Sequence, residues 1–183
     1  DALASIGNYL RGFGWRPGET WGYEVKLPGG FNYNNVWSGT VATLGDWSGT
    51  GVVRANGRAF PRPSDAARLY MPMGGNGPVF AVLDNFGVIK RYNNSDSYAL
   101  AVGHLADRIL GSGGFASAWP KDTALGKDGR KQVQTLLLRR GYDIGSADGV
   151  IGPKTRGAVM DFQARAGLLP DGHVSGNLLK ALG

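Results

Sequence analysis

Glycine, serine and proline dominate residues 111–123, "GSGGFASAWPKDT", and no apolar residue recurs there at helical or strand spacing. A segment of this kind is typical of a linker between domains. With 183 residues, the chain is long enough for two small domains, and the pattern differs on the two sides of the segment. We therefore predict a first domain over residues 1–110, a linker over 111–124 and a second domain over 125–183.

The first domain is predicted to be of the α+β class. Leu3, Ile6 and Leu10 share one helical face, and a Gly-Phe-Gly sequence ends that helix. Residues 16–86 are rich in Gly, Pro and Asn and contain short β-like runs such as "WGYEVKL", "GVVRA" and "PVFAVL". These runs predict a small, irregular β subdomain.

The stretch "VIKRYNNSDSYALAVGHLADRI" follows a segment, "PVFAVLDNFGVI", that has the composition of a strand. A helix is predicted next, and Asn94 or Ser95 should cap it by accepting hydrogen bonds from free N–H groups of its first turn. Arg91, Tyr92 and Asn93 remain before that helix. Amides beside an aromatic ring suit a carbohydrate, which has polar edges and a flat apolar face. A solvated connection with a capping residue is the alternative.

The second domain is predicted to contain three helices. Apolar spacing marks a helix in "QVQTLLLRRG", Pro153 begins the second helix and Gly167 ends it, and Ser175 caps a short third helix. The two connecting loops, "DGVIG" and "DGHVSG", echo each other, and each places Asp-Gly in a tight turn before a helix.

Composition excludes several kinds of site. The chain has no cysteine, which rules out disulfides and thiol chemistry. Its two histidines, His104 and His173, lie far apart in the sequence, so we expect no metal site and no cofactor. No window approaches the roughly 18 uncharged apolar residues that a membrane helix requires. Because the chain begins with Asp and not Met, we expect a mature or processed form.

The net charge of +6 favours a polyanionic partner, and both nucleic acid and cell wall qualify. The basic residues are scattered, apart from "KDGRK" and "LLRRG", which are typical of a solvated helix face. No phosphate-binding loop, helix-turn-helix or RNA-binding sheet motif is present. Nucleic acid is therefore only a minor hypothesis.

Two family resemblances cover most of the chain. The segments "QVQTLLLRRGY", "DGVIGPKTRGAVMDFQARAGL" and "DGHVSGNLLKAL" resemble the three-helix peptidoglycan-binding domain of bacterial cell-wall hydrolases. The segments "DALASIGNYLRGFGWRPGE", "LGDWSGTGV" and "NFGVIKRYNNSDSYALAVGHLADRI" resemble the C-terminal part of the MltB-type lytic transglycosylases. The resemblance implies the C-terminal part of a lysozyme-like catalytic domain with a small β subdomain, followed by a small three-helix bundle. It also implies peptidoglycan glycan strands and stem peptides as partners, in the periplasm or cell envelope.

The resemblance assigns four residues to a glycan cleft: Tyr92, Asn93, Tyr98 and Tyr9. Aromatic rings would cover the apolar faces of sugars, and the amide would hydrogen-bond their polar groups. For Tyr9 and Tyr98, a core aromatic on a helix face is the alternative.

The catalytic glutamic acid of these transglycosylases has no counterpart in this chain. In the family, one Glu acts as acid and then as base while the muramyl 6-hydroxyl attacks the anomeric carbon, which leaves a 1,6-anhydro product. Glu19 and Glu24 are the only glutamates, and neither matches that position; Asp84 is the nearest substitute. Whether the chain is itself an enzyme stays open, and a non-catalytic peptidoglycan-binding protein is the alternative.

In the second domain, the loop "ADGVIGPKTRG" offers an acceptor, a hydroxyl and a cation near a helix N-terminus, in Asp148, Thr155 and Arg156. Such a place suits the carboxylates of stem peptides. The alternative is that Asp148 and Thr155 only fix the turn and cap the helix. We also expect the glycine-rich linker to let this domain move as an independent anchor.

Overall fold

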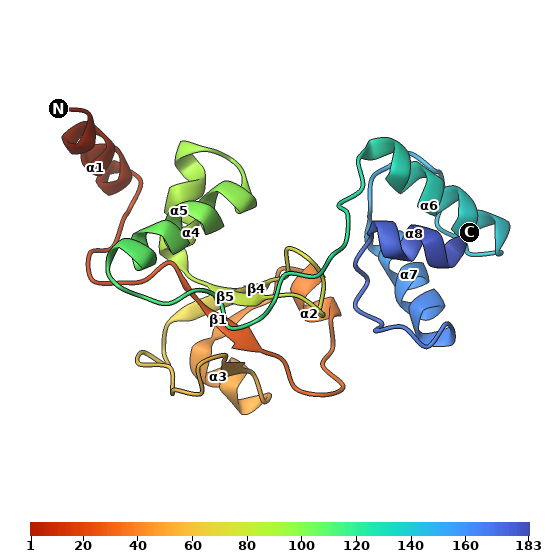
Figure 1. The fold of residues 1–183 in the computed structure, drawn as a ribbon, viewed down its shortest axis with the longest axis horizontal. Coiled ribbons are helices and arrows are strands. Elements are labelled where there is room, and N and C mark those ends of the chain that lie inside the picture. Colours follow the sequence, from red (N-terminus) through yellow and green to blue (C-terminus); the bar gives the residue numbers. More distant parts are fainter.

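The computed structural model describes residues 1–183 as a sheet-containing body and a helical body joined by one extended segment (Figure 1). No helix is both long and apolar enough to cross a membrane. The elements in chain order are α1 (Ala2–Gly12), β1 (Gly22–Lys26), α2 (Asn34–Trp37), β2 (Val41–Thr43), α3 (Leu44–Gly49), β3 (Val53–Arg54), β4 (Ala66–Tyr70), β5 (Val79–Val82), α4 (Asp84–Tyr92), α5 (Asp96–Ile109), α6 (Lys127–Arg139), α7 (Pro153–Arg165) and α8 (Gly176–Leu182).

The sheet is antiparallel, with strand order β2-β4-β5-β1-β3, so β5 is its central strand. All four residues of β5 are buried because both faces of the sheet are covered. Val79 and Ala81 join a core cluster that includes residues of α2 and α3, while Phe80 and Val82 join a second cluster with residues of α4 and α5. The "PVFAVL" run therefore reads as continuously apolar because alternate residues enter different cores.

The prediction of a strand continuing through "DNFGVI" is wrong, because the strand ends at Val82 and these residues begin α4. Phe86 and Ile89, three positions apart, are both buried on the helix face that meets the sheet. Tertiary packing thus overrides the strand preference of the β-branched residues. The predicted cap at Ser95 is confirmed, since its hydroxyl accepts a hydrogen bond from the Tyr98 N–H at 3.2 Å.

A buried asparagine fixes the connection between α1 and β1. Asn85 is 1% exposed, and its side-chain oxygen accepts from the Arg16 N–H at 2.9 Å. Its amide group donates to the carbonyls of Arg16 and Glu19. Each polar atom of this buried side chain has a partner, so α4 holds the chain that leaves α1 in one place.

Gly103→Ala should destabilise the sheet-containing body. A Cβ at this position of α5 would lie 2.7 Å from the Trp21 ring, which is buried. Forcing that ring to shift should lower the free energy of unfolding by about 1–3 kcal/mol, as measured by chemical denaturation. The control is Gly87→Ala in α4, where nothing lies within 4 Å; it should stabilise by roughly 0.5–1 kcal/mol through helix propensity. Equal effects at both positions would contradict this packing argument.

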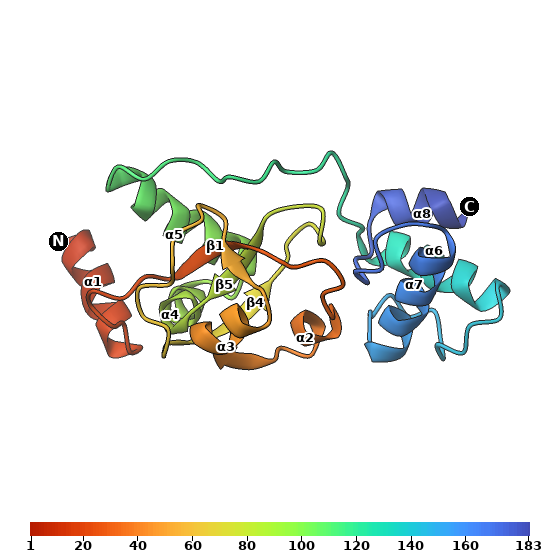
Figure 2. The same ribbon diagram turned by 90° about the horizontal axis from the view of Figure 1, so that it is seen from below.

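The segment between the two bodies runs along the first of them (Figure 2) and contacts it through Phe115, Ala116 and Ser117. The Phe115 ring contacts the Phe80 ring edge-on at 5.0 Å and stacks on His104 at 3.9 Å. Both carboxylate oxygens of Glu24 accept backbone N–H groups, from Ala116 and Ser117, at 2.7 Å each. The structure thus places Phe115, Ala116 and Ser117 of the linker against the sheet-containing body, where the sequence predicted a flexible tether.

The helical body matches the predicted three-helix arrangement. Pro153 occupies the first turn of α7, and the Ser175 hydroxyl caps α8 by accepting from the Leu178 N–H at 3.4 Å. The three helices enclose a separate core around residues such as Val133 and Leu137, both fully buried.

Candidate functional site

Three predicted tyrosines come together from three different helices of the sheet-containing body. Tyr9 of α1 contacts Tyr92 edge-on at 5.5 Å, and Tyr92 stacks on Tyr98 at 6.2 Å with an interplanar angle of 17°. The Tyr9 hydroxyl donates to the carbonyl of Arg91 at 3.0 Å. We call Tyr9, Tyr92 and Tyr98 the tyrosine cluster.

The tyrosine cluster is open to solvent on one side. Tyr92 is 53% exposed and Tyr9 is 37% exposed, whereas Tyr98 packs partly against the core of the sheet-containing body. Tyr92 is the last residue of α4 and Asn93 is its C-cap, so the turn between α4 and α5 presents both residues. Exposed aromatic rings with an amide beside them form a surface suited to the flat faces of sugars.

The carboxylates that sequence reasoning considered for catalysis are all engaged elsewhere. Asp84 pairs with Arg16 at 2.7 Å. Glu19 pairs with Arg62 at 2.9 Å, and Glu24 holds the docked linker. None of the three has a contact with a residue of the tyrosine cluster. None of these three carboxylates is therefore placed to give a proton to a ligand on this surface.

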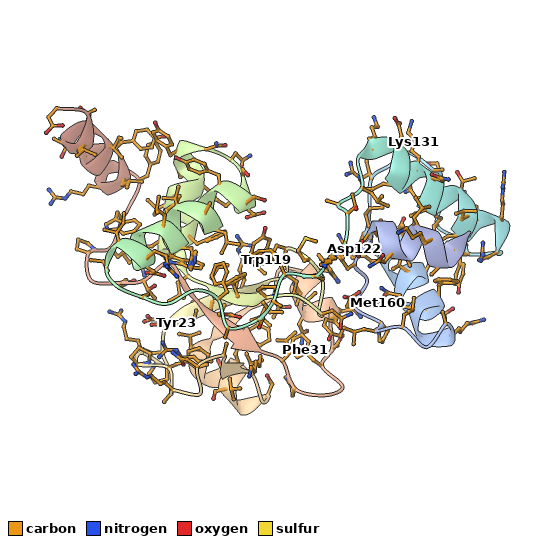
Figure 3. The ribbon with its side chains drawn as sticks, in the orientation of Figure 1. Tyr23, Phe31, Trp119, Asp122, Lys131 and Met160 are labelled. Carbon is orange, nitrogen blue, oxygen red and sulfur yellow. The ribbon has the colours of Figure 1, made fainter.

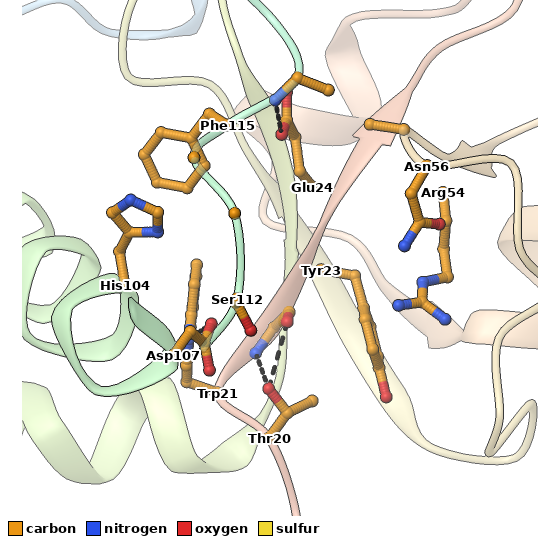
Figure 4. A pocket seen from close by; sticks show the side chains of 15 residues that line it. Thr20, Trp21, Tyr23, Glu24, Arg54, Asn56, His104, Asp107, Ser112 and Phe115 are labelled. Atoms are coloured by element: carbon orange, nitrogen blue, oxygen red, sulfur yellow. Dashed lines mark hydrogen bonds between the residues drawn. The ribbon is translucent and has the colours of Figure 1, made fainter. Parts of the chain in front are cut away.

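A depression of about 430 Å³ lies between β1, α5 and the linker (Figure 4). The Trp21 indole N–H at its base donates to Asp107 at 2.8 Å. On its other side the Arg54 guanidinium lies over the Tyr23 ring at 4.6 Å. The polar groups of this depression thus mainly bind one another and the linker. No cluster of three or more His, Asp or Glu residues forms a metal site.

Two of the predicted residues of the second domain make intramolecular contacts within that domain. Asp148 accepts hydrogen bonds from the Val150 N–H and from the Gln134 side chain, and these bonds lower its pKa. Thr155 is 3% exposed, and Gly152, not Thr155, is the N-cap of α7. Asp148 thus helps to fix the turn, whereas Thr155 is part of the buried interior.

Arg156, the third predicted residue, lies at the contact between the two bodies. Its guanidinium lies 3.6 Å from the centre of the Trp37 ring and donates to the Gly172 carbonyl at 2.9 Å. Burial lowers the pKa of Arg156 to about 10, so it stays charged at neutral pH. The structure does not bring Asp148, Thr155 and Arg156 together with the tyrosine cluster.

Trp37 and Asp171 complete this contact, which we call the junction. The Trp37 indole N–H donates to the Asp171 carbonyl at 2.6 Å, and the Asp171 carboxylate accepts from the Gly75 N–H at 2.8 Å. Figure 3 labels Met160 of α7 and Asp122, near the end of the linker, in the region where the two bodies meet. Sequence reasoning missed the junction because its partners lie about a hundred residues apart and leave no local pattern.

His173 beside the junction should make stability depend on pH. Burial lowers its pKa from 6.5, the carboxylates of Asp171 and Asp122 oppose that shift, and Arg156 adds to it. Its Nε2 atom is buried without a hydrogen-bond partner, so a charge there would be poorly compensated.

Between this lowered pKa and 6.5, the unfolded chain binds more protons than the folded chain. The free energy of unfolding should therefore be highest above pH 6.5 and fall as the pH drops below it. Chemical denaturation at several pH values between neutral and mildly acidic measures the slope of the free energy of unfolding against pH. His173→Gln should flatten it, and an unchanged slope in that variant would contradict the assignment.

The sequence profile of the transglycosylase SLT domain matches residues 1–107, which is more than half of the chain. The chain belongs to this family. A second profile, that of a peptidoglycan binding domain, matches residues 126–182. The expected resemblance and the expected fold class are both confirmed.

Among solved structures, this SLT-family chain is similar to SltB3 from Pseudomonas aeruginosa. The complex of SltB3 with NAG-anhNAM-pentapeptide is 44% identical, with a TM-score of 0.85, and the match covers 100% of this chain and 49% of that one. The complex of SltB3 with NAG-NAM-pentapeptide is also 44% identical, with a TM-score of 0.86, and the match covers 100% of this chain and 50% of that one. The chain thus spans about half the length of these relatives. None of the curated proteins compared with the chain matches it.

Sequence reasoning about this SLT-family chain also missed two glutamines, Gln134 and Gln163. They are 1% and 6% exposed, and their side chains hold the two Asp-Gly loops of the helical body. The available signal was a glutamine on an otherwise apolar helix face, followed by a repeated Asp-Gly loop.

Proposed function

We propose that the chain binds and remodels peptidoglycan as the C-terminal portion of a lytic transglycosylase. Such an enzyme cleaves the β-1,4 bond between N-acetylmuramic acid and N-acetylglucosamine and leaves 1,6-anhydro products. Residues 1–110 would be the C-terminal portion of the catalytic region, 111–124 the linker and 125–183 the peptidoglycan-binding domain. Periplasm or cell envelope is the corresponding location.

The tyrosine cluster, in a chain of the SLT family, is the observation that carries this proposal. Its exposed rings can cover the apolar face of a sugar, and Asn93 can hydrogen-bond an acetamido or hydroxyl group. Asp148, Thr155 and Arg156 were considered for contacts with stem peptides. Of these, Asp148 is the one that remains exposed.

Lytic cleavage requires a proton donor at the glycosidic oxygen. Glu19, Glu24 and Asp84 are held in ion pairs or hydrogen bonds away from the tyrosine cluster. In this proposal the acid therefore comes from a segment outside residues 1–183. The same observation favours a second candidate function, a peptidoglycan-binding protein without catalytic activity.

The test is to incubate the purified chain with peptidoglycan sacculi. We expect the chain to sediment with the sacculi and to release no 1,6-anhydromuropeptides, as followed by mass spectrometry. Addition of the upstream segment from the same reading frame should then produce them if the chain is part of an enzyme. Failure to sediment would contradict the proposed function. Anhydro products from the chain alone, lost in Glu19→Gln, Glu24→Gln or Asp84→Asn, would place the acid within these residues.

A further inference from the structure

The helical body contains the same hydrogen-bonded loop twice. In the first loop, the Gln134 side chain donates to Asp148 Oδ1 at 3.2 Å and accepts from the Gly149 N–H at 2.6 Å. In the second loop, the Gln163 side chain donates to Asp171 Oδ1 at 2.9 Å and accepts from the Gly172 N–H at 2.8 Å. Both glycines have positive φ, +82° and +70°, which the tight turn requires.

The equivalence extends to the neighbouring bonds. Oδ1 of each aspartate also accepts the N–H two residues along, from Val150 or His173, at 2.8 Å in both cases. The carbonyl of each glycine accepts from an arginine, which is Arg130 in the first loop and Arg156 in the second. Each loop therefore uses one carboxylate oxygen internally and directs the other oxygen, Oδ2, away from its glutamine.

The second loop reveals which groups its outward face binds. Asp171 Oδ2 accepts the backbone N–H of Gly75, and the Asp171 carbonyl accepts the indole N–H of Trp37. Both donors belong to the sheet-containing body. The outward face of this loop thus takes two N–H donors from outside the helical body, next to an apolar ring.

In the first loop, no group of the chain donates to Oδ2 or to the carbonyl of Asp148. Val150, beside them, is 67% exposed although it is apolar. Both residues border a depression of about 330 Å³ that also includes Ile144 and Lys154. The first loop therefore presents the same acceptors as the second, with an exposed apolar side chain beside them.

We propose that the Asp148 loop is a recognition site for an amide N–H next to a methyl group. The N–H would donate to Asp148 Oδ2 or to its carbonyl, and the methyl group would lie against Val150. In peptidoglycan, this chemistry comes from the alanyl amides of stem peptides and from the acetamido groups of the glycan. The inference rests on the proposed function and deepens it. It differs from the carboxylate site expected from the sequence, because its ligand donates an N–H instead of presenting a carboxylate, and because Arg156 lies at the junction.

Two probes distinguish the two sources: chitotetraose, which carries acetamido groups without peptide, and a soluble stem peptide that ends in D-Ala-D-Ala. Each is titrated into the ¹⁵N-labelled whole chain, and the amide signals of Gly149 and Val150 are followed. We expect at least one probe to shift these signals to saturation. If neither probe does so although the chain sediments with sacculi, the site is overturned while the proposed function stands. If the chain does not sediment, the proposed function itself fails.

Asp148→Asn is the decisive variant, because it keeps the inner oxygen for Val150 and Gln134 but replaces the outer acceptor with an NH₂ donor. We expect the Kd for the probe to rise about fivefold or more. Asp128→Asn removes the same charge from the helical body, at an exposed position in the first turn of α6 that does not border the depression, and should leave the Kd unchanged. An equal loss of affinity in both variants would show that only net charge matters, and would overturn the proposal.

A second variant, Val150→Ser, tests the site without changing the hydrogen bonds of the Asp148 turn. The Val150 side chain contributes little to the fold, because it is largely exposed. It should weaken binding about threefold through the lost methyl contact, without a change in Tm. Unaltered affinity in both Val150→Ser and Asp148→Asn would refute the site even if Asp148→Asn proved less stable.

Discussion

Trp37→Ala is expected to detach the helical body from the sheet-containing body. The substitution removes the half-buried ring that lies under Arg156 and the indole N–H that donates to the Asp171 carbonyl. Loss of this packing and hydrogen bond should weaken the junction by about 2–4 kcal/mol. Small-angle X-ray scattering should report a larger radius of gyration, and thermal unfolding should split into two transitions.

The matched control for this effect is Trp37→Phe, which keeps an aromatic ring under Arg156 but loses the indole N–H. It should weaken the junction by only about 0.5–1.5 kcal/mol, the usual contribution of one hydrogen bond. An unchanged scattering profile and a single transition for Trp37→Ala would show that the linker and the remaining contact from the Gly75 N–H to Asp171 are enough to hold the bodies together.

Tyr92→Ala, introduced into a protein that also carries the acid-bearing segment proposed above, is expected to lower kcat/KM at least tenfold, or ~1.4 kcal/mol of transition-state stabilisation. The ring is the centre of the tyrosine cluster, so its loss removes the contacts to both Tyr9 and Tyr98. The fold should change little because the side chain is 53% exposed. Release of anhydromuropeptides measures turnover, and Asn93→Ala should lower it similarly.

Tyr92→Phe serves as the control because it keeps the stacked ring and removes only the hydroxyl. Its turnover should stay within about threefold of the original if ring stacking is the main contribution. Unchanged turnover in both Tyr92→Ala and Asn93→Ala would show that these residues only connect α4 to α5, which is the alternative that the sequence leaves open.

Features with a local cause were predictable from the sequence. Ser95 and Ser175 cap helices, and Pro153 begins one, because each satisfies or avoids the free N–H groups of a first turn. Strand β5 was predictable as a strand, but its end was not. The first residues of α4 that follow it include Phe86, Val88 and Ile89, which strands also favour, and the choice between the two structures is made by packing against the sheet.

The candidate site was predictable only in part. Family resemblance pointed to Tyr9, Tyr92 and Tyr98, and the structure brings them together. The roles of Glu24 and Arg156 could not be predicted, because their partners lie in distant segments and are chosen by the tertiary fold. A charged side chain has no local signature that separates a ligand contact from a contact within the protein.

The docked linker changes how the peptidoglycan-binding domain can contribute to retention on a polymer. A free tether would set an effective concentration through its length and flexibility, with every orientation sampled. Here Glu24 and Phe115 hold the first part of the tether, and Trp37 binds the helical body at the junction, so the orientation of the two bodies is set before any ligand arrives. Capture of a strand by the helical body would then also fix the angle at which the tyrosine cluster meets it. Affinity for an ordered wall should accordingly exceed affinity for the same material in disordered fragments.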